Sequence, residues 1–474
     1  MTRLFISATH KSSGKTTVSI GLCAALRAQG SIVQPFKKGP DYIDPLWLGA
    51  ASGRACHNLD FNTMTPDEII QTVQRYSLNT DIALIEANKG LYDGMALDGS
   101  DSNAAIAKLT RSPVVLVVDT RGMTRGIAPL LLGYQAFDHD INIAGIIFNR
   151  VGGARHAAKL RESVEYHTDI NVLGAVQNNP EMEIEERHLG LMPSNESGEA
   201  EAQIARIRDL VAEQVDLDLL RGIAEERNPS QPPLIRGGAR DSAVLLPPFP
   251  DKGRVGEGFL RIGICQDPAF GFYYPGDLEA LQQAGAELVP VNTLTDTALP
   301  NIDGLFIGGG FPETHMQQLA ANVAMRESIR TAIDNGLPTY AECGGLMYLS
   351  RSLVWNGQQA AMVGIIPGDA VMHPKPQGRG YVKLQETADM PWPGGNMTHT
   401  INAHEFHYSR LENLTATGKF AYRMQRGTGI DGQHDGWIYR HLLASYTHMR
   451  DTSQFHWAQR FVAFIRQTTR KTTA

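Results

Sequence analysis

The stretch up to Gly30 constrains the fold most, because it has the strand, loop and helix order of a phosphate-binding loop. Arg3–Ala8 (RLFISA) is predicted to be a short buried strand, and a helix is predicted through about Gln29, where Gly30 ends it. Between them lies Gly14-Lys15-Thr16-Thr17. In such a loop, backbone amides and the helix N-terminus hold phosphates, the lysine adds positive charge and Thr16 can bind Mg²⁺.

The loop departs from the usual phosphate-binding pattern at one point. Ala8-Thr9 stands where the first glycine of that pattern would be. A chance match is the alternative interpretation. The predicted strand and helix on either side favour nucleotide binding.

Gln34–Pro45 (QPFKKGPDYIDP) is predicted to be a rigid loop just after the second strand, because Gly and Pro stand beside two lysines and two aspartates. These residue types are common in solvated turns, which is the alternative interpretation. The functional interpretation is a site where Mg²⁺ and an anionic substrate meet.

Acidic residues follow the third predicted strand, Asp81–Glu86 (DIALIE). A carboxylate at the C-terminal end of a parallel strand lies where doubly wound sheets bind their ligands. Glu86 is therefore a candidate metal ligand, and Asp93 in the next segment is a candidate for contact with substrate or metal. The alternative for both is a carboxylate in a solvated loop.

The remaining strands of the first half are continuous apolar runs, Pro113–Asp119 (PVVLVVD) and Ile141–Asn149 (INIAGIIFN), which indicates burial on both faces of a sheet. Asn149 ends the second run, where its amide could pair with an adenine edge. Helices and strands alternate to about Val176, so this half is predicted to be an α/β domain around a parallel sheet. Residues 226–258 are rich in Pro and Gly and are predicted to be an interdomain linker.

A cysteine at a predicted sharp turn marks the second half. Pro338–Leu346 reads PTYAECGGL, which predicts a strand, a bend at Cys343 and then a helix. The glycines tolerate the strained angles of such a bend, and the helix dipole favours a thiolate. A buried structural cysteine is the more common fate of a lone Cys. The flanking glycines and the downstream histidines favour a nucleophile.

Two further segments could serve that cysteine. The predicted strand Asp303–Ile307 runs into Gly308-Gly309-Gly310, which could present bare amides to an oxyanion or simply form a tight turn. His448 follows a strand-like run and could deprotonate Cys343 if the two meet in space, although a lone histidine is usually a surface or core residue. His404–His407 lacks the HExxH spacing, so zinc is not expected there.

Composition narrows the class of protein. The 474 residues suggest two or three domains, and the formal net charge of −7 with a pI near 6.1 gives no support for a nucleic-acid partner. The four cysteines lack disulfide or zinc-finger spacing. Neither a membrane-spanning run nor a signal segment is found, so a cytoplasmic protein is expected.

Several motifs, in order along the chain, resemble those of the glutamine-dependent cobyrinate a,c-diamide synthases: FKKGPDYIDP, EANKGLYDG, FNRVGGARH, GGGFPE, AECGGLMYL, HEFHYSR and ASYTHMR. The resemblance covers essentially the whole chain except the linker. It implies a P-loop NTPase-type synthetase domain similar to dethiobiotin synthetase over residues 1–225, and a class I glutamine amidotransferase domain with a flavodoxin-like sheet over 259–470. It implies ATP and Mg²⁺ as cofactors.

By position, the resemblance implies roles for the candidate residues. Cys343 would be the nucleophile and His448 its base, with Gly309, Gly310 and Gly344 at the oxyanion. The other implied sets are Gly14, Lys15, Thr16, Thr17, Lys37 and Asn149 for the nucleotide; Thr16, Asp44 and Glu86 for the metal; and Asp41, Tyr42, Ile43, Asp44 and Asp93 for the substrate.

The chain departs from the family pattern at three places. Ala8 replaces a glycine, Ala87-Asn88-Lys89 replaces Gly-Val-Met, and Arg450 stands where a second histidine is usual. Lys89 could alter which tetrapyrrole is accepted. Amidation of sirohaem or sirohydrochlorin, and a nucleotide-switched regulatory ATPase, are therefore kept as alternatives. The expected partners are tetrapyrrole and glutamine, with a homodimer as one possible assembly and no nucleic acid or membrane.

Overall fold

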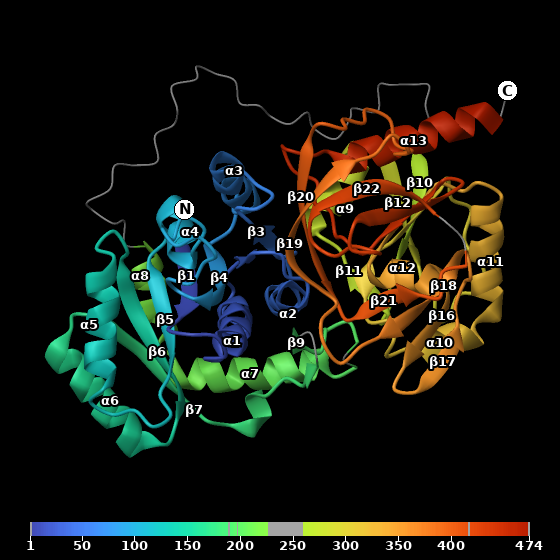
Figure 1. The fold of residues 1–474 in the computed structure, drawn as a ribbon. Helices are drawn as coiled ribbons and strands as arrows, with labels where there is room; N and C mark the ends of the chain where they lie inside the picture. Colours follow the sequence, from blue (N-terminus) through green and yellow to red (C-terminus); the bar gives the residue numbers. More distant parts are fainter. Residues whose placement is uncertain (1, 188–189, 197, 226–258, 416–417, 473–474) are drawn as a thin grey trace. The chain divides into compact units, whose positions relative to one another are not determined.

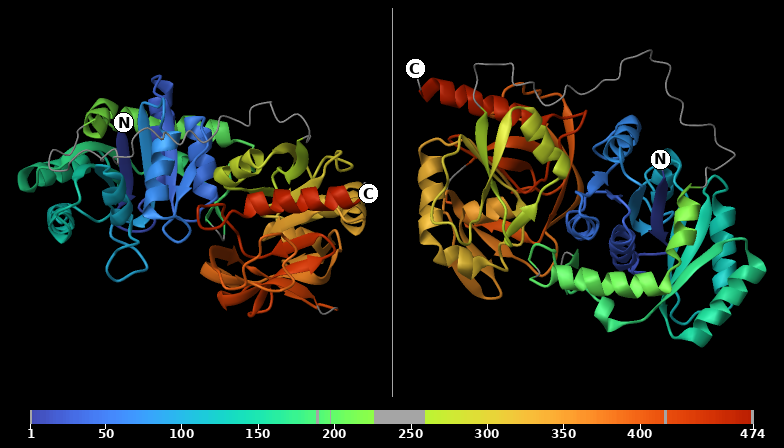
Figure 2. Two further views of the ribbon diagram at one scale, coloured as in Figure 1. Left: turned by 90° about the horizontal axis from the view of Figure 1, so that it is seen from above. Right: turned by 180° about the vertical axis from the view of Figure 1, so that it is seen from behind.

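The computed structural model describes residues 2–187, 190–196, 198–225, 259–415 and 418–472, and the chain divides into two compact units, Met1–Asp241 and Ser242–Ala474 (Figures 1 and 2). The predicted linker, 226–258, lies outside the described residues. Across the described helices, none is long and apolar enough to span a bilayer.

The first unit alternates strands and helices, as predicted. Its elements are β1 (Arg3–Ala8), α1 (Lys15–Ala28), β2 (Val33–Lys38), α2 (Ile43–Ser52), β3 (His57–Leu59), α3 (Pro66–Tyr76), β4 (Ile82–Gly90), α4 (Asn103–Thr110), β5 (Val114–Asp119), α5 (Ile127–Phe137), β6 (Ile143–Val151), α6 (Ala154–His167), β7 (Asn171–Gln177), the 3₁₀ helix η1 (Pro180–Met182), β8 (Glu186–Arg187), β9 (Gly190–Leu191), α7 (Ala200–Gln214) and α8 (Leu217–Glu225).

A seven-stranded sheet in the order β3-β2-β4-β1-β5-β6-β7 forms the centre of this unit, and every pairing within it is parallel. Apolar side chains of α3 to α6 pack with Phe5, Ile85 and other strand residues into one buried cluster. On α1, Gly21 allows close packing against α7, because a Cβ there would lie 2.4 Å from Val211 Cγ2. The parallel α/β domain predicted from the apolar runs is confirmed.

The structure corrects the predicted loop at 34–45. Lys37 and Lys38 belong to β2, and α2 already begins at Ile43. The lysines were assigned to a loop because charge usually avoids buried strands, but both are buried, with Lys37 fully so. Strand β4 also continues past Glu86 to Gly90, so Glu86 lies within a strand rather than at its end.

The second unit is richer in strands. Its elements are β10 (Leu260–Cys265), β11 (Phe270–Phe272), α9 (Pro275–Gln283), β12 (Ala286–Val291), β13 (Gly304–Ile307), β14 (Gly309–Gly310), α10 (Met316–Ala321), α11 (Val323–Asp334), β15 (Thr339–Glu342), α12 (Gly344–Leu349), β16 (Ser350–Trp355), β17 (Gln358–Ala361), β18 (Ile366–Met372), β19 (Gly378–Glu386), β20 (Thr400–His407), β21 (Ser409–Glu412), β22 (Lys419–Arg426), β23 (His434–Tyr439), β24 (Leu442–Ser445) and α13 (Trp457–Thr472).

Its main sheet has nine strands in the order β12-β10-β13-β15-β24-β23-β22-β19-β20. The first five are mutually parallel, and their order corresponds to the 2-1-3-4-5 arrangement of flavodoxin-like sheets. From β24 onwards the pairings are antiparallel. The flavodoxin-like sheet predicted for this domain is thus confirmed in its five parallel strands, and four antiparallel strands extend the sheet beyond β24.

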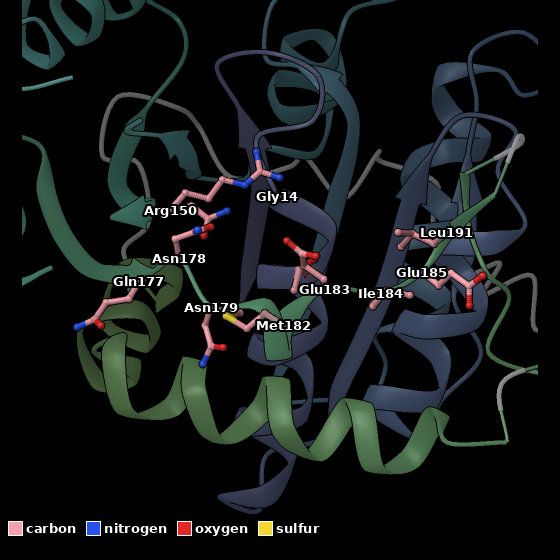
Figure 3. A pocket seen from close by; sticks show the side chains of 12 residues that line it. Gly14, Arg150, Gln177, Asn178, Asn179, Met182, Glu183, Ile184, Glu185 and Leu191 are labelled. Carbon is pink, nitrogen blue, oxygen red and sulfur yellow. The ribbon is translucent and has the colours of Figure 1, made fainter. Parts of the chain in front are cut away.

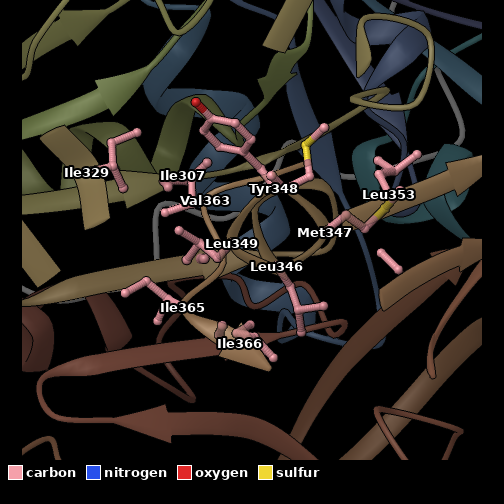
Figure 4. Close-up of a cluster of buried hydrophobic side chains, with 14 of the residues drawn as sticks. Ile307, Ile329, Leu346, Met347, Tyr348, Leu349, Leu353, Val363, Ile365 and Ile366 are labelled. Atoms are coloured by element: carbon pink, nitrogen blue, oxygen red, sulfur yellow. The ribbon is translucent and has the colours of Figure 1, made fainter. Parts of the chain in front are cut away.

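Alternate residues of the central strands pack on opposite faces of this sheet, as the two-residue period of a strand requires. Leu305, Ile307 and Ala341 belong to the cluster that contains α11 and α12 (Figure 4). Phe306 and Tyr340 belong to the cluster that contains α13. Both faces of β13 and β15 are therefore buried, which fixes where Cys343 emerges.

Candidate active sites

In the first unit, the phosphate-binding loop leads directly into α1, which Gly14 caps with a φ of +82°. The predicted strand, loop and helix are all present. A Cβ at Gly14 would lie 2.1 Å from Asn149 Nδ2, and this Nδ2 donates a hydrogen bond of 2.8 Å to Ser13 O. Asn149 therefore seats the loop, while the positive φ and the lack of space restrict position 14 to glycine.

A cluster of charged side chains lies under the loop, around the Lys37 ammonium. Lys37 Nζ donates to Asp44 Oδ2 at 2.5 Å, to Glu86 Oε1 at 2.7 Å and to Ala87 O at 3.1 Å. Burial disfavours the ammonium, but Asp44 and Glu86 outweigh this and raise the pKa of Lys37. Lys15 Nζ lies 3.4 Å from Glu86 Oε1. The Lys37 cluster thus joins three separate sequence motifs.

Thr16 links this cluster to the loop, since its hydroxyl donates to Glu86 Oε1 at 2.8 Å and to Asp44 Oδ2 at 3.2 Å. The other Glu86 oxygen, Oε2, is buried and has no hydrogen-bond partner among the described residues. Two carboxylates and a hydroxyl are oxygen ligands of the kind Mg²⁺ prefers, completed in such sites by water and phosphate oxygens. The three predicted metal ligands are therefore brought together, and they fit Mg²⁺.

The other predicted substrate residues lie around this cluster. Asp41 Oδ1 accepts from the Asp44 N–H, and burial together with Asp44 raises the pKa of Asp41. Tyr42 is half-buried at the start of α2, while Ile43 is buried. Asp93 is exposed, and its carboxylate accepts from the Gly90 N–H at 2.9 Å, so it is engaged at that turn rather than in the Lys37 cluster.

A cavity of about 580 Å³ opens beside the loop (Figure 3). Its lining residues are Gly14, Thr17, Asn149, Arg150, Gln177, Asn178, Asn179, Met182, Glu183, Ile184, Glu185 and Leu191. The amide side chains of Gln177, Asn178 and Asn179 lie at one side of the cavity, with Met182 beside Asn179, and Ile184 and Leu191 lie at the other side together with Glu185. A mixture of apolar and polar groups is typical of sites that bind small molecules.

Sequence reasoning missed the support on the far side of the loop. Arg150 donates to Ser12 O at 2.8 Å and to Asp119 Oδ2 at 2.8 Å. Although burial opposes the charged form, hydrogen bonds from Arg121 and Arg150 lower the pKa of Asp119 to about 2. In the sequence, the only indication of this support was that a carboxylate, Asp119, ends the apolar run that forms β5.

In the second unit, Cys343 occupies the predicted bend between β15 and α12, with φ of +46° and ψ of −98°. Its N–H donates to Ser445 O at 2.7 Å, which ties the bend to the end of β24. Burial, Glu313 and Glu342 raise the pKa of the thiol, and a hydrogen bond from Gly344 only partly opposes them. The direction of the pKa is therefore opposite to that expected from the helix dipole alone, because burial and the two carboxylates act on a thiol at the start of a helix of only six residues.

The predicted base lies beside the predicted oxyanion segment. A Cβ at Gly309 would lie 2.7 Å from His448 Cε1 and 3.5 Å from Nε2, and a Cβ at Gly344 would lie 3.0 Å from Gly310 N. The Gly309–Gly310 backbone therefore contacts both the His448 ring and the residue after Cys343. These two glycines form β14, paired with β11, rather than a free turn.

Glu342 is the residue of this site that sequence reasoning missed. Its Oε2 lies 3.3 Å from His448 Nδ1, and its Oε1 accepts from Tyr340 OH at 2.6 Å and from Met449 N at 2.9 Å. The signal was present, since Glu342 directly precedes Cys343, but its partner stands 106 residues further along the chain.

Family models match both halves of the chain. A model of the CobQ/CobB/MinD/ParA nucleotide binding domain matches residues 4–191, and one of the CobB/CobQ-like glutamine amidotransferase domain matches residues 261–454. The first of these matches, a nucleotide-binding domain, implies that the chain uses ATP.

Three curated relatives are similar over nearly the whole chain, and each is called cobyrinate a,c-diamide synthase. The protein from Magnetococcus marinus is 45% identical, covering 98% of this chain and 97% of its own. Those from Methanosarcina acetivorans and Archaeoglobus fulgidus are each 39% identical, covering 94% and 97% of this chain and 92% and 96% of their own. These matches confirm the resemblance carried by the motifs.

Proposed function

Because this chain belongs to the cobyrinate a,c-diamide synthase family, we propose that it converts the a and c side-chain carboxylates of cobyrinate to amides during cobalamin biosynthesis. ATP activates each carboxylate, and glutamine supplies the nitrogen. The observation that carries the proposal is the presence of two complete sites on one chain, the Lys37 cluster beneath a phosphate-binding loop and the Cys343 turn beside His448.

The amidotransferase domain, residues 259–470, generates ammonia. His448 takes the proton of the Cys343 thiol, and the sulfur attacks the side-chain amide carbon of glutamine. Gly344 lies beside the backbone nitrogen of Gly310, and the backbone N–H groups of this segment stabilise the oxyanion. Ammonia leaves with a proton returned by His448, and water then hydrolyses the thioester to glutamate.

The synthetase domain, residues 1–225, uses that ammonia. Gly14–Thr17 hold the phosphates of ATP, and the cavity beside Asn149 accommodates the base. A carboxylate of the tetrapyrrole, bound near Asp41–Asp44 and Asp93, attacks the γ-phosphate, and ADP leaves. The acyl phosphate that forms is attacked by ammonia, which gives the amide and releases phosphate. Lys15 and Lys37 neutralise charge during phosphoryl transfer.

Thr16, Asp44 and Glu86 would hold Mg²⁺, which when bound neutralises charge on the phosphates. Lys37 holds both carboxylates in place, since its ammonium contacts each of them. Asp44 and Glu86 thus contact the Lys37 ammonium and, together with the Thr16 hydroxyl, supply the oxygens for the metal ion.

The proposal places the enzyme in the cytoplasm, where ATP and glutamine are available, and allows a homodimer. It predicts small-molecule partners only. Gel filtration coupled to light scattering measures the assembly directly.

Product mass tests the reaction. The protein is incubated with Mg-ATP, glutamine and either cobyrinate, sirohaem or sirohydrochlorin. Two carboxyl-to-amide conversions on cobyrinate are expected. A Cys343→Ala variant should lose this activity with glutamine and keep it with ammonium salts, because it lacks only the glutaminase nucleophile.

The other outcomes separate the alternatives. Amidation of only sirohaem or sirohydrochlorin would assign a different tetrapyrrole to the same chemistry, with exposed Lys89 as the first residue to exchange. ATP hydrolysis without amidation of any of the three would favour a regulatory ATPase.

A further inference from the structure

Glu342 is a buried carboxylate at the end of β15, directly before the predicted nucleophile, and only 3% of it is exposed. Both of its oxygens are engaged. Oε1 accepts from Tyr340 OH and from the Met449 backbone N–H, and Oε2 lies 3.3 Å from His448 Nδ1. Glu342 therefore contacts the histidine and also the backbone of the residue after it.

The segment that carries His448 is held at further points. Asp435 accepts from the Tyr446 and Thr447 N–H groups at 3.0 and 2.9 Å. The backbones of His404 and His448 exchange hydrogen bonds, and their rings stack with centroids 5.0 Å apart. The backbone position of His448 is thus fixed without Glu342, so the Glu342 contact with Nδ1 bears on the ring itself.

The two nitrogens of that ring have different surroundings. Nδ1 faces the Glu342 carboxylate, while the Cε1–Nε2 edge faces the Gly309 backbone next to the Cys343 turn. A carboxylate next to Nδ1 stabilises the tautomer with the proton on Nδ1 and leaves Nε2 as the acceptor. Only that tautomer can take a proton at the edge that faces Gly309, beside the Cys343 turn.

We propose that Glu342 is the positioning residue for His448, fixing its ring and its tautomer for deprotonation of Cys343. The inference rests on the proposed glutaminase step. One strand end then supplies the nucleophile and the group that orients its base, as consecutive residues.

The proton balance follows from this arrangement. The thiol proton moves to Nε2 as the S–C bond to glutamine forms, and the nearby Glu342 carboxylate stabilises the imidazolium. When the C–N bond breaks, Nε2 returns the proton to the departing ammonia. Glu342 exchanges no proton in either step.

Several charged and titratable groups surround this pair and enter any pH profile. The Cys343 thiol is one of these groups, and Glu313 is another because its charge raises the pKa of Cys343. His404 stacks on His448, and its pKa is lowered by burial, His448 and Arg450. Arg450 lies over the Tyr274 ring at 5.0 Å. Removing the Glu342 charge leaves His404 and Arg450 in place beside the His448 ring.

The test compares Glu342→Gln with wild type in the full-length enzyme, using glutamine or ammonium chloride as nitrogen donor. The glutamine-dependent kcat/KM should fall about 10²-fold or more, mainly through kcat. The pH dependence of this rate should also change, because the His448 ring loses its neighbouring carboxylate. The ammonia-dependent rate should not change, because that reaction bypasses the glutaminase site.

Glu386→Gln is the matched control. Glu386 is another carboxylate of this unit, 5% exposed, that accepts from Arg460 and from the Asn396 N–H. This control should keep the wild-type pH profile with glutamine. The proposal is overturned if Glu342→Gln behaves like Glu386→Gln.

A measurement on the unaltered enzyme covers the case in which Glu342→Gln does not fold. The ¹⁵N shifts of His448, assigned by difference from His448→Gln, should show a protonated Nδ1 and an unprotonated Nε2 near neutral pH. The opposite tautomer would overturn the proposal. If wild type amidates none of the tetrapyrroles, the proposed function fails, while glutamate release from glutamine still measures the effect of Glu342.

Discussion

Replacing Lys37 by methionine should destabilise the first unit, because the buried ammonium donates to three oxygens, two of them in buried contacts. The distances are 2.5 Å to Asp44, 2.7 Å to Glu86 and 3.1 Å to Ala87 O. Methionine fills a similar volume but leaves two carboxylates facing one another without that cation. Breaking a buried ion pair by removing one partner costs about 3–5 kcal/mol. For a unit of this size, that predicts a fall in Tm of about 6–20 °C.

Lys38→Met is the matched control for this substitution, since Lys38 is the next residue of β2 and donates to a single backbone oxygen, Asp101 O. Differential scanning calorimetry of both variants, with and without Mg²⁺, measures the effect. Lys37→Met should melt below Lys38→Met and should gain more from Mg²⁺ than wild type, because a divalent cation replaces the lost charge. Equal Tm values for the two variants, with no added gain from Mg²⁺, would refute the reasoning.

Two further predictions concern the second unit. Gly310→Ala should abolish glutamine-dependent amidation and spare the ammonia-dependent reaction, because the new Cβ would lie 2.0 Å from Ala269 O and displace β14; an unchanged glutamine-dependent rate would contradict this. Hydrogen bonds from Arg351, Ser352 and Asn413 lower the pKa of Asp369 to about 2 despite burial. Its contribution to stability is therefore complete above the unfolded pKa near 3.9 and lost as pH falls towards 2, so urea unfolding of Asp369→Asn should be less acid-dependent over that range than wild type.

Much of the fold could be predicted because its strands are apolar runs buried on both faces. β1, β5 and β6 were recognised in this way, whereas β3 has only three residues, His57–Leu59, and gives no comparable signal. The bend at Cys343 was also predicted, since two glycines follow a strand there. The raised pKa of the Cys343 thiol was not predicted, because the burial and the Glu313 carboxylate that cause it come from elements distant in the sequence.

Prediction of the sites from the sequence failed for the same reason at Lys37 and Glu342, because their partners are distant along the chain. Two lysines beside Gly-Pro-Asp favour a loop on local grounds, and only Glu86, 49 residues away, explains a lysine inside a buried strand. In the sequence alone, Glu342 next to Cys343 cannot be distinguished from a solvated carboxylate. Its contact with His448 exists only because β15 and β24 pair in register, Glu342 with Ser445.

The positive φ of Cys343 has a consequence for how selection acts on this position. A non-glycine residue held at such a φ costs of order 1–3 kcal/mol, which glycine would largely avoid. The backbone conformation at this position therefore disfavours the cysteine that occupies it. In a lineage that obtained ammonia from another source, this codon would be free to drift, and drift to glycine would leave a more stable domain without its chemistry.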